Sequence, residues 1–205
     1  LKSGNINNSW LTALEEQMSG IGVAIAAARR EQVQKLNAFI EQNPDDVFPE
    51  AVLTLDGTIE QMLDSKPAIY VEDFYRESLF NQRRSILFND SGNNINKTDL
   101  CAVYKKKNVP AGLCSTGEQK SLLLSIILAQ AKSLLHSRGI PPILLLDEVA
   151  AHLDDSKKDA LLSKIKAMHL QAWLTTTTLF EFLSIRETAQ FFEVKDNTVR
   201  EIILG

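Results

Sequence analysis

Two neighbouring carboxylates in the stretch "ILLLDE", Asp147 and Glu148, are the residues best placed to do chemistry. The apolar run before them has the pattern of a fully buried parallel strand. In open α/β sheets, ligands bind beyond the carboxyl ends of the strands. Hydrolysis of a nucleoside triphosphate needs one acid to hold Mg²⁺ and another to align or deprotonate the attacking water. Taken alone, the pair fits this chemistry and a plain cap of the next helix equally well.

A second unusual stretch is "STGEQKSLLLSIILAQAK", which begins at Ser115. Its apolar spacing predicts a helix. Ser115 and Glu118 have the spacing of a capping box, in which each side chain satisfies a free backbone donor of the first turn. Gly117 has no part in that capping box, although a glycine costs about 1 kcal/mol against alanine inside a helix. Its presence therefore needs another reason.

A complete nucleotide site would also need a phosphate loop of the form G-x-x-x-x-G-K-[ST]. Gly112 and Gly117 have the right spacing in "GLCSTGEQKS", but Glu118 occupies the lysine position. A carboxylate there would repel the phosphates, so this stretch is not a phosphate loop. The chain therefore carries half of a nucleotide-hydrolysing site and lacks the other half.

Composition limits the remaining classes. The 205 residues carry a net charge of −4, and 44% of them are hydrophobic, which favours a globular protein without a broadly basic surface. No apolar run reaches the roughly 18 residues of a membrane span, and no leader opens the chain, so a soluble cytoplasmic protein is expected. Cys101 and Cys114 suggest neither a disulfide framework nor zinc. The local basic clusters are Arg29-Arg30, Arg83-Arg84 and Lys105-Lys106-Lys107.

Periodicity and breakers predict the elements that position these residues. A mainly helical first part should precede a strand–helix–strand arrangement in the last third, which indicates an α/β sheet. The expected elements are a helix over 10–42 with a soft point at Gly20–Gly22, a strand over 51–57, helices over 59–64 and 69–84, a hairpin formed by 86–94 and 99–108, a helix from 115, a strand at 143–146, a helix capped by Asp154 or Asp155, a strand over 171–178, and a hairpin turning at Asp196-Asn197.

Three motifs together carry a family resemblance. "STGEQK" resembles the signature motif of ABC-type ATPases, whose serine, glycine and helix N-terminus reach the γ-phosphate bound by a partner subunit. That role would explain Gly117. "LLLDE" resembles a Walker B strand and "AAHLD" the D-loop of a dimer interface. With "QAWLTTTT" and the helical stretch "WLTALEEQMSGIGVAIAAARREQVQKL", they resemble the RecF family of bacterial SMC-like repair ATPases over most of the chain.

The resemblance implies an α/β fold, the C-terminal half of an ABC-type P-loop ATPase head with a mainly helical second lobe. The lobe would cover residues 1–85 and the ATPase part 86–205. Asp147 would hold Mg²⁺ through water, and Glu148 would act as general base. Ser115, Gly117, Glu118 and Gln119 would contact ATP in trans, and Asp154 would lie in the dimer interface. Thr176 would also contact the nucleotide, because it stands where transporter ATPases keep a switch histidine. A threonine at this position counts against a transporter subunit.

The resemblance also implies a DNA repair and recombination function. An ATP-dependent homodimer would clamp DNA at single-strand/duplex junctions, with RecR and RecO as partners, and would assist recombinase loading. The basic clusters would contact phosphates. A Walker A half would precede Leu1, so this chain alone is expected to hydrolyse no ATP. In place of the family's Gly-Pro-His-Arg segment stands "NINKTDL", with Lys97 at the arginine position.

Two alternatives stay open. Another SMC-like ATPase head would need long coiled-coil arms, and the sequence shows no sustained heptads. A non-catalytic interaction module built on a decayed ATPase fold would agree with the absent phosphate loop and the altered "NINKTDL" segment, but not with the intact Asp147-Glu148 pair.

Overall fold

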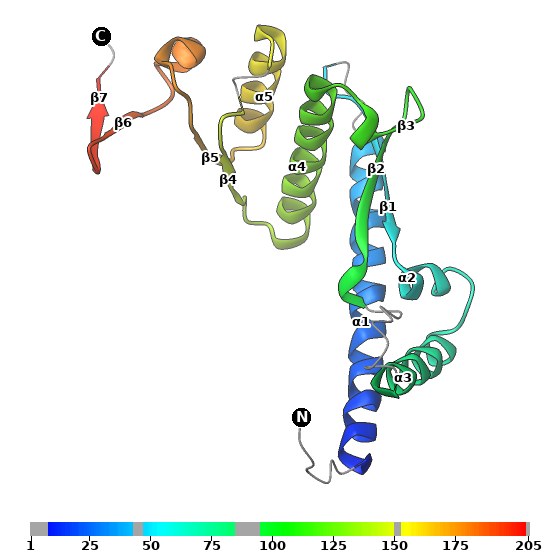
Figure 1. Cartoon of the computed structure of the whole chain (residues 1–205). Helices are drawn as coiled ribbons and strands as arrows, with labels where there is room; N and C mark the ends of the chain where they lie inside the picture. The colour runs from blue at the N-terminus through cyan, green and yellow to red at the C-terminus, as the bar shows by residue number, and fades with distance from the viewer. Residues whose placement is uncertain (1–7, 43–46, 85–94, 150–152, 204–205) are drawn as a thin grey trace. The chain divides into compact units, whose positions relative to one another are not determined.

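The computed structural model describes residues 8–42, 47–84, 95–149 and 153–203 (Figure 1). They form two compact units, Leu1–Ser137 and Arg138–Gly205. The first unit contains α1 (Asn8–Glu41), β1 (Ala51–Asp56), α2 (Thr58–Met62), α3 (Ala68–Arg84), β2 (Asp99–Tyr104), β3 (Val109–Pro110) and nearly all of α4 (Thr116–Arg138). The second contains β4 (Ile143–Leu146), α5 (Asp155–Ala167), β5 (Gln171–Leu174), the 3₁₀ segment η4 (Leu179–Ile185), β6 (Phe191–Lys195) and β7 (Thr198–Ile202).

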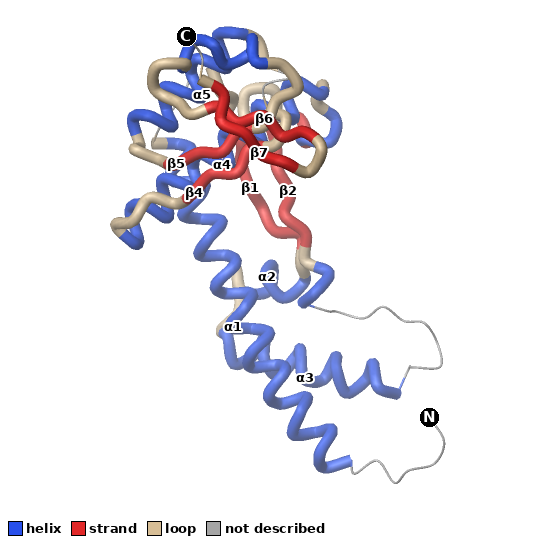
Figure 2. Tube along the Cα trace, turned by 90° about the vertical axis from the view of Figure 1, so that its left-hand side faces the viewer, coloured by secondary structure: helices blue, strands red, loops and turns tan. Residues whose placement is uncertain are grey.

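Helix α1 runs without a break through the predicted soft point. Gly22 serves there as a place of close approach, because a Cβ atom on it would lie 2.5 Å from Cε1 of Tyr75 in α3. A Cβ atom on Gly20 would meet nothing within 4 Å. The glycine at 22 therefore permits helix packing, as the contact of α1 with α3 in Figure 2 illustrates.

Two hydrophobic clusters lie along α1. The first joins α1 to α2 and α3 and contains Val23, Ala26, Ile59, Val71, Tyr75 and Ile95. The second joins the C-terminal part of α1 to β1 and α4 and contains Leu36, Ile40, Ala51, Leu53, Leu122 and Ala129. Because α1 contributes to both clusters, it links α2 and α3 to β1 and α4 within the first compact unit. The division into a lobe over 1–85 and an ATPase part over 86–205 stays a prediction.

The first unit carries a three-stranded antiparallel sheet in the order β1-β2-β3. Strand β2 pairs with β1, with Leu53 opposite Ala102, and its short hairpin partner is β3. The first strand of the predicted hairpin between 86–94 and 99–108 lies outside the described residues. At the free edge of β1, the Asn37 side chain accepts from the Leu53 N–H at 2.8 Å and donates to the Leu53 carbonyl at 2.9 Å.

In the second unit, β4 and β5 pair in parallel around α5, with Leu146 opposite Leu174. Burial along β4 alternates, because Leu144 and Leu146 are buried while Ile143 is 59% and Leu145 78% exposed. The prediction of a fully buried strand is therefore wrong here, since β4 and β5 form a two-stranded sheet in which only one face of β4 is covered.

Two local predictions for the second unit are confirmed. Strands β6 and β7 form an antiparallel hairpin. Its turn residues, Asp196 and Asn197, both have positive φ, as the tightest hairpin turns require. Asp154 is the N-cap of α5, with its side chain accepting from the Lys157 N–H at 2.9 Å. No helix in the described ranges combines the length and apolar character needed to cross a membrane.

Candidate functional site

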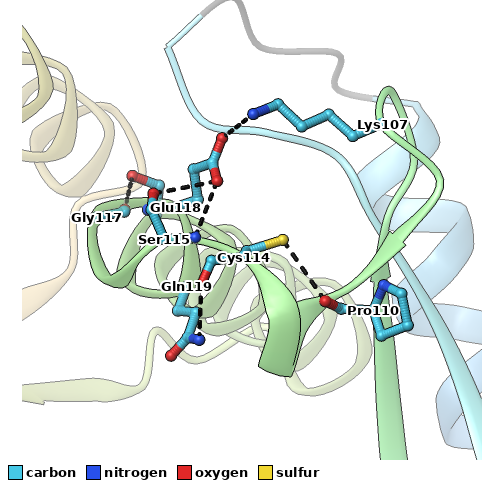
Figure 3. A network of polar contacts seen from close by, with 8 residues as sticks. Lys107, Pro110, Cys114, Ser115, Gly117, Glu118 and Gln119 are labelled. Carbon is cyan, nitrogen blue, oxygen red and sulfur yellow. Dashed lines mark hydrogen bonds and ion pairs between the residues drawn. The ribbon is translucent and has the colours of Figure 1, made fainter.

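The start of α4 is a closed hydrogen-bonded ring between Ser115 and Glu118 (Figure 3). The Ser115 N–H donates to Glu118 Oε2 at 3.1 Å, and the Glu118 N–H donates to Ser115 Oγ at 3.4 Å, which confirms the predicted capping box. The Ser115 hydroxyl also donates to Glu118 Oε2 over 3.1 Å. Its only hydrogen is therefore committed to the Glu118 carboxylate.

Lys107, which the sequence predicts to contact DNA, completes this ring. Lys107, in the turn between β2 and β3, forms an ion pair with Glu118 Oε1. Hydrogen bonding from Lys107, and then from the Ser115 backbone, holds the pKa of Glu118 below its ordinary value. The same hydrogen bond raises the pKa of Lys107. The β2–β3 turn is thereby tied to the first turn of α4.

Gly117 and Gln119 lie beside this ring and have different surroundings. A Cβ atom on Gly117 would meet nothing within 4 Å, so no contact within the described residues requires a glycine there. Gln119 turns back along the chain, and its amide donates to the carbonyls of Cys114 at 3.0 Å and Gly112 at 3.3 Å. Gln119 holds the loop before the helix, while Gly117 leaves space above its backbone.

The second unit places Asp147 and Glu148 directly after β4, with both side chains exposed. Glu148 has a φ of 46°, in the left-handed region that a non-glycine residue seldom occupies. Thr175, the first residue after β5, reaches both acids. Its hydroxyl donates to Asp147 Oδ1 at 2.5 Å and accepts from the Glu148 N–H at 2.9 Å. The sequence analysis missed Thr175, whose only signal was its place at the end of the strand parallel to β4.

Thr176, which the sequence placed at the switch position, faces another element. Its hydroxyl donates to Glu181 in η4 and lies 3.0 Å from the Thr178 carbonyl. The Thr178 N–H donates back to it at 3.2 Å. These contacts stabilise the start of η4 and do not bring Thr176 to Asp147 or Glu148. Its assignment to the nucleotide stays a prediction.

Asp154, the predicted interface residue, is an exposed cap whose carboxylate is shared with Lys157. Hydrogen bonds from the backbone and then the side chain of Lys157 lower the pKa of Asp154. The preceding residues of the predicted D-loop, 150–152, lie outside the described part of the chain. The role of Asp154 in a dimer stays a prediction.

The exposed carboxylates fit a magnesium ion of the kind that accompanies a nucleotide. Within the described ranges, no three histidine, cysteine or acidic side chains gather into a cluster that could hold a metal by themselves. Mg²⁺ commonly uses only one or two carboxylates and takes its other ligands from water and phosphates. Asp147, exposed and with one oxygen held by Thr175, suits such a partial ligand.

Of the arginines predicted to contact DNA, the three whose side chains the structure describes lie beside acids. Arg29 donates to Glu60 at 3.2 Å and to the Ile95 carbonyl at 2.8 Å. Arg30 donates to the Leu63 carbonyl at 2.9 Å and pairs with Asp64. Arg83 lies 3.4 Å from Glu15, and the side chain of Arg84 lies outside the described structure. Glu60 is buried and also accepts from Thr98 at 3.0 Å, which anchors part of the "NINKTDL" segment.

The three lysines differ from one another. Lys105 pairs with Glu50 at 2.7 Å, and Lys107 pairs with Glu118. Lys106 between them is exposed. Of this turn, Lys106 is the side chain for which the described contacts give no acidic partner. A neighbouring carboxylate offsets part of the positive charge of Lys105 and of Lys107, so the predicted patch should attract phosphate less strongly than its sequence suggests.

Two curated relatives and two solved structures that match this chain are RecF proteins. No family model matches the chain. The DNA replication and repair protein RecF of Mesorhizobium japonicum is 41% identical over 201 residues, which cover 97% of this chain and 53% of that protein. The same protein of Brucella abortus is 39% identical over 196 residues, covering 95% of this chain and 51% of that protein. The chain thus spans about half the length of the curated relatives it matches.

Solved structures agree on the fold. The ATP complex of the recombination mediator protein RecF in the RecFOR pathway superposes with a TM-score of 0.74 at 16% identity, over 98% of this chain and 52% of that one. The complex described as RecF-ATPrS gives the same TM-score over 97% of this chain. The predicted fold class, part of an ABC-type ATPase head with a mainly helical lobe, is confirmed. The chain belongs to the RecF family and fits its C-terminal portion.

Proposed function

We propose that this chain supplies the signature and Walker B parts of an ABC-type ATPase that acts in DNA repair and recombination. The observation that carries the proposal is the exposed Asp147-Glu148 pair at the end of a parallel strand, in a chain of the RecF family. The capped start of α4 supports it independently, because its glycine leaves open space where an anion would approach the helix N-terminus.

The two carboxylates divide the work of hydrolysis. Bound Mg²⁺-ATP supplies the phosphoryl group that water attacks. Asp147 is the residue that would hold Mg²⁺, through water, with its other oxygen fixed by Thr175. Glu148 accepts a proton from the attacking water, since an exposed carboxylate beside the reaction can act as general base.

At the signature, charge decides what the helix start can bind. A bare Glu118 carboxylate would repel phosphate and oppose the helix dipole's attraction for it. The ion pair with Lys107 offsets that charge. Ser115 can donate its hydroxyl to a phosphate only after releasing Glu118, whereas the backbone at Gly117 is open throughout. We infer that Ser115 and Gly117 contact the nucleotide of a partner subunit, with Glu118 and Gln119 holding the loop.

Beyond hydrolysis, we propose an ATP-dependent homodimer that binds DNA at single-strand/duplex junctions and works with RecR and RecO. Support comes from the family and from the solved RecF structures, which are described as a recombination mediator of the RecFOR pathway. DNA contacts would be made to phosphates without sequence preference. Lys106 is the best candidate for such a contact, because Arg29, Arg30, Lys105 and Lys107 are held by acids.

The test uses the full-length protein that contains this chain. Glu148→Gln should abolish ATP hydrolysis and trap an ATP-bound dimer, seen by light scattering with and without ATP. Glu193→Gln, an exposed glutamate on β6, is the matched control and should behave as the unmodified protein. Hydrolysis by Glu148→Gln at the unmodified rate would refute the proposal. A full-length protein that neither binds nor hydrolyses ATP would favour an interaction module on a decayed ATPase fold.

A further inference from the structure

Thr175 links the two acids through a single hydroxyl group. The Glu148 N–H can only donate, so the Thr175 oxygen is its acceptor at 2.9 Å. The Asp147 carboxylate accepts, so the Thr175 hydrogen points to Oδ1 at 2.5 Å. The hydroxyl thus has one hydrogen-bonding arrangement that satisfies both neighbours, and it fixes one residue through the side chain and the other through the backbone.

The backbone of Glu148 needs such support. With a φ of 46°, Glu148 is in the left-handed region, where a residue with a Cβ atom is strained. Such conformations persist where the surroundings hold them, and they cluster at functional sites. The bond from the Glu148 N–H to Thr175 is the described contact that holds this backbone.

The sheet itself does not depend on the Thr175 hydroxyl. The Thr175 N–H donates to the Leu146 carbonyl at 3.1 Å, which continues the β4–β5 pairing through the backbone. Thr175 is also exposed, so its side chain fills no part of the core. Removing the hydroxyl while keeping the shape of the side chain should therefore leave the strand pair intact.

We propose that Thr175 is a positioning residue that sets the orientation of both Asp147 and Glu148. The inference rests on the proposed function, in which Asp147 serves the metal and Glu148 the attacking water. Without the Thr175 hydroxyl, Asp147 loses the donor on one oxygen and Glu148 loses the acceptor that keeps its backbone in the left-handed conformation. Each carboxylate would then sample orientations in which it cannot serve the reaction.

The first experiment measures the contact in this chain, without nucleotide. Thr175→Val removes the hydroxyl and keeps the shape, Thr175→Ser keeps the hydroxyl, and Thr177→Val is the control at the exposed threonine two residues on. Amide hydrogen exchange at Glu148 should accelerate about fivefold in Thr175→Val, the loss expected for one hydrogen bond. It should be unchanged in the other two variants. Equal exchange in all three would overturn the proposal.

The second experiment measures the consequence in the full-length protein. Thr175→Val should lower kcat about tenfold or more, because a misplaced general base contributes less. It should also raise the Mg²⁺ concentration for half-maximal rate, while Thr175→Ser restores both values and Thr177→Val changes neither.

The outcomes separate this inference from the proposed function. If the unmodified full-length protein hydrolyses ATP and Thr175→Val matches it in rate and Mg²⁺ dependence, the positioning role is overturned and the ATPase stands. If the unmodified protein hydrolyses no ATP, the proposed function fails and the positioning role falls with it, even where amide exchange confirms the Thr175 contact. A loss of rate in Thr175→Val that Thr175→Ser restores supports both.

Discussion

Two glycines two residues apart in α1 should respond in opposite ways to the same substitution. Alanine is favoured over glycine inside a helix by about 1 kcal/mol. Gly20→Ala should gain that amount, since its new Cβ atom meets nothing within 4 Å. At Gly22, the new atom would lie 2.5 Å from Cε1 and 3.1 Å from Cδ1 of Tyr75.

The Tyr75 ring has little freedom to yield. Its residue is 2% exposed, and Val71, one helical turn earlier in the same cluster, is 0% exposed. Inserting an atom into a packed core of this kind costs about 1 to 3 kcal/mol. After the helix gain of about 1 kcal/mol is subtracted, Gly22→Ala should destabilise the protein by up to about 2 kcal/mol. The two variants should therefore differ by about 1 to 3 kcal/mol.

Urea unfolding followed by far-ultraviolet circular dichroism measures this difference. The midpoint should rise in Gly20→Ala and fall or stay level in Gly22→Ala, with the slope unchanged in both. A further variant isolates the cause, because Gly22→Ala should lose its penalty when Tyr75 is replaced by the smaller leucine. The reasoning fails if Gly22→Ala raises the midpoint as much as Gly20→Ala does.

Two further predictions concern the sheet edge and the start of α4. Asn37→Ala removes both hydrogen bonds to the Leu53 backbone and should cost about 1 to 3 kcal/mol in urea unfolding, while Asn81→Ala on the exposed face of α3 should cost far less. An equal effect of the two would contradict the role of Asn37. The pKa of Glu118 is lowered below its ordinary value of 4.5, so its contribution to stability is complete above that value and disappears as pH falls through the folded-state pKa. The backbone amide NMR signals of residues 115 and 118 should therefore shift as the pH falls in the unmodified chain. They should not shift in Glu118→Gln, which has no carboxyl group at this position. Identical pH titration curves for the two proteins would count against the capping ion pair.

Features set by residues near one another in sequence were predictable. The Ser115–Glu118 capping box, the Asp154 cap and the Asp196-Asn197 turn each depend on a spacing of a few residues, and all three are confirmed. Periodicity also placed the helices and most strands, because burial on one face imposes the period of the element.

Features that depend on register between distant segments were not predictable. Lys107 meets Glu118 across a sheet turn, and Thr175 meets Asp147 through parallel pairing of β4 with β5. No pattern in one sequence says which of four successive threonines will stand beside the acids, since shifting the pairing by one residue exchanges the faces. Burial of β4 was overestimated for a related reason, because an apolar run does not reveal which face its neighbours cover.

The length of α1 has a mechanical consequence. Its 34 residues make a rod of about 50 Å, far longer than the average helix of a globular protein. One cluster packs against α1 beside α3, and the other packs against it beside β1 and α4. A tilt of α1 where it packs against α3 would therefore displace the part of the helix that packs against α4.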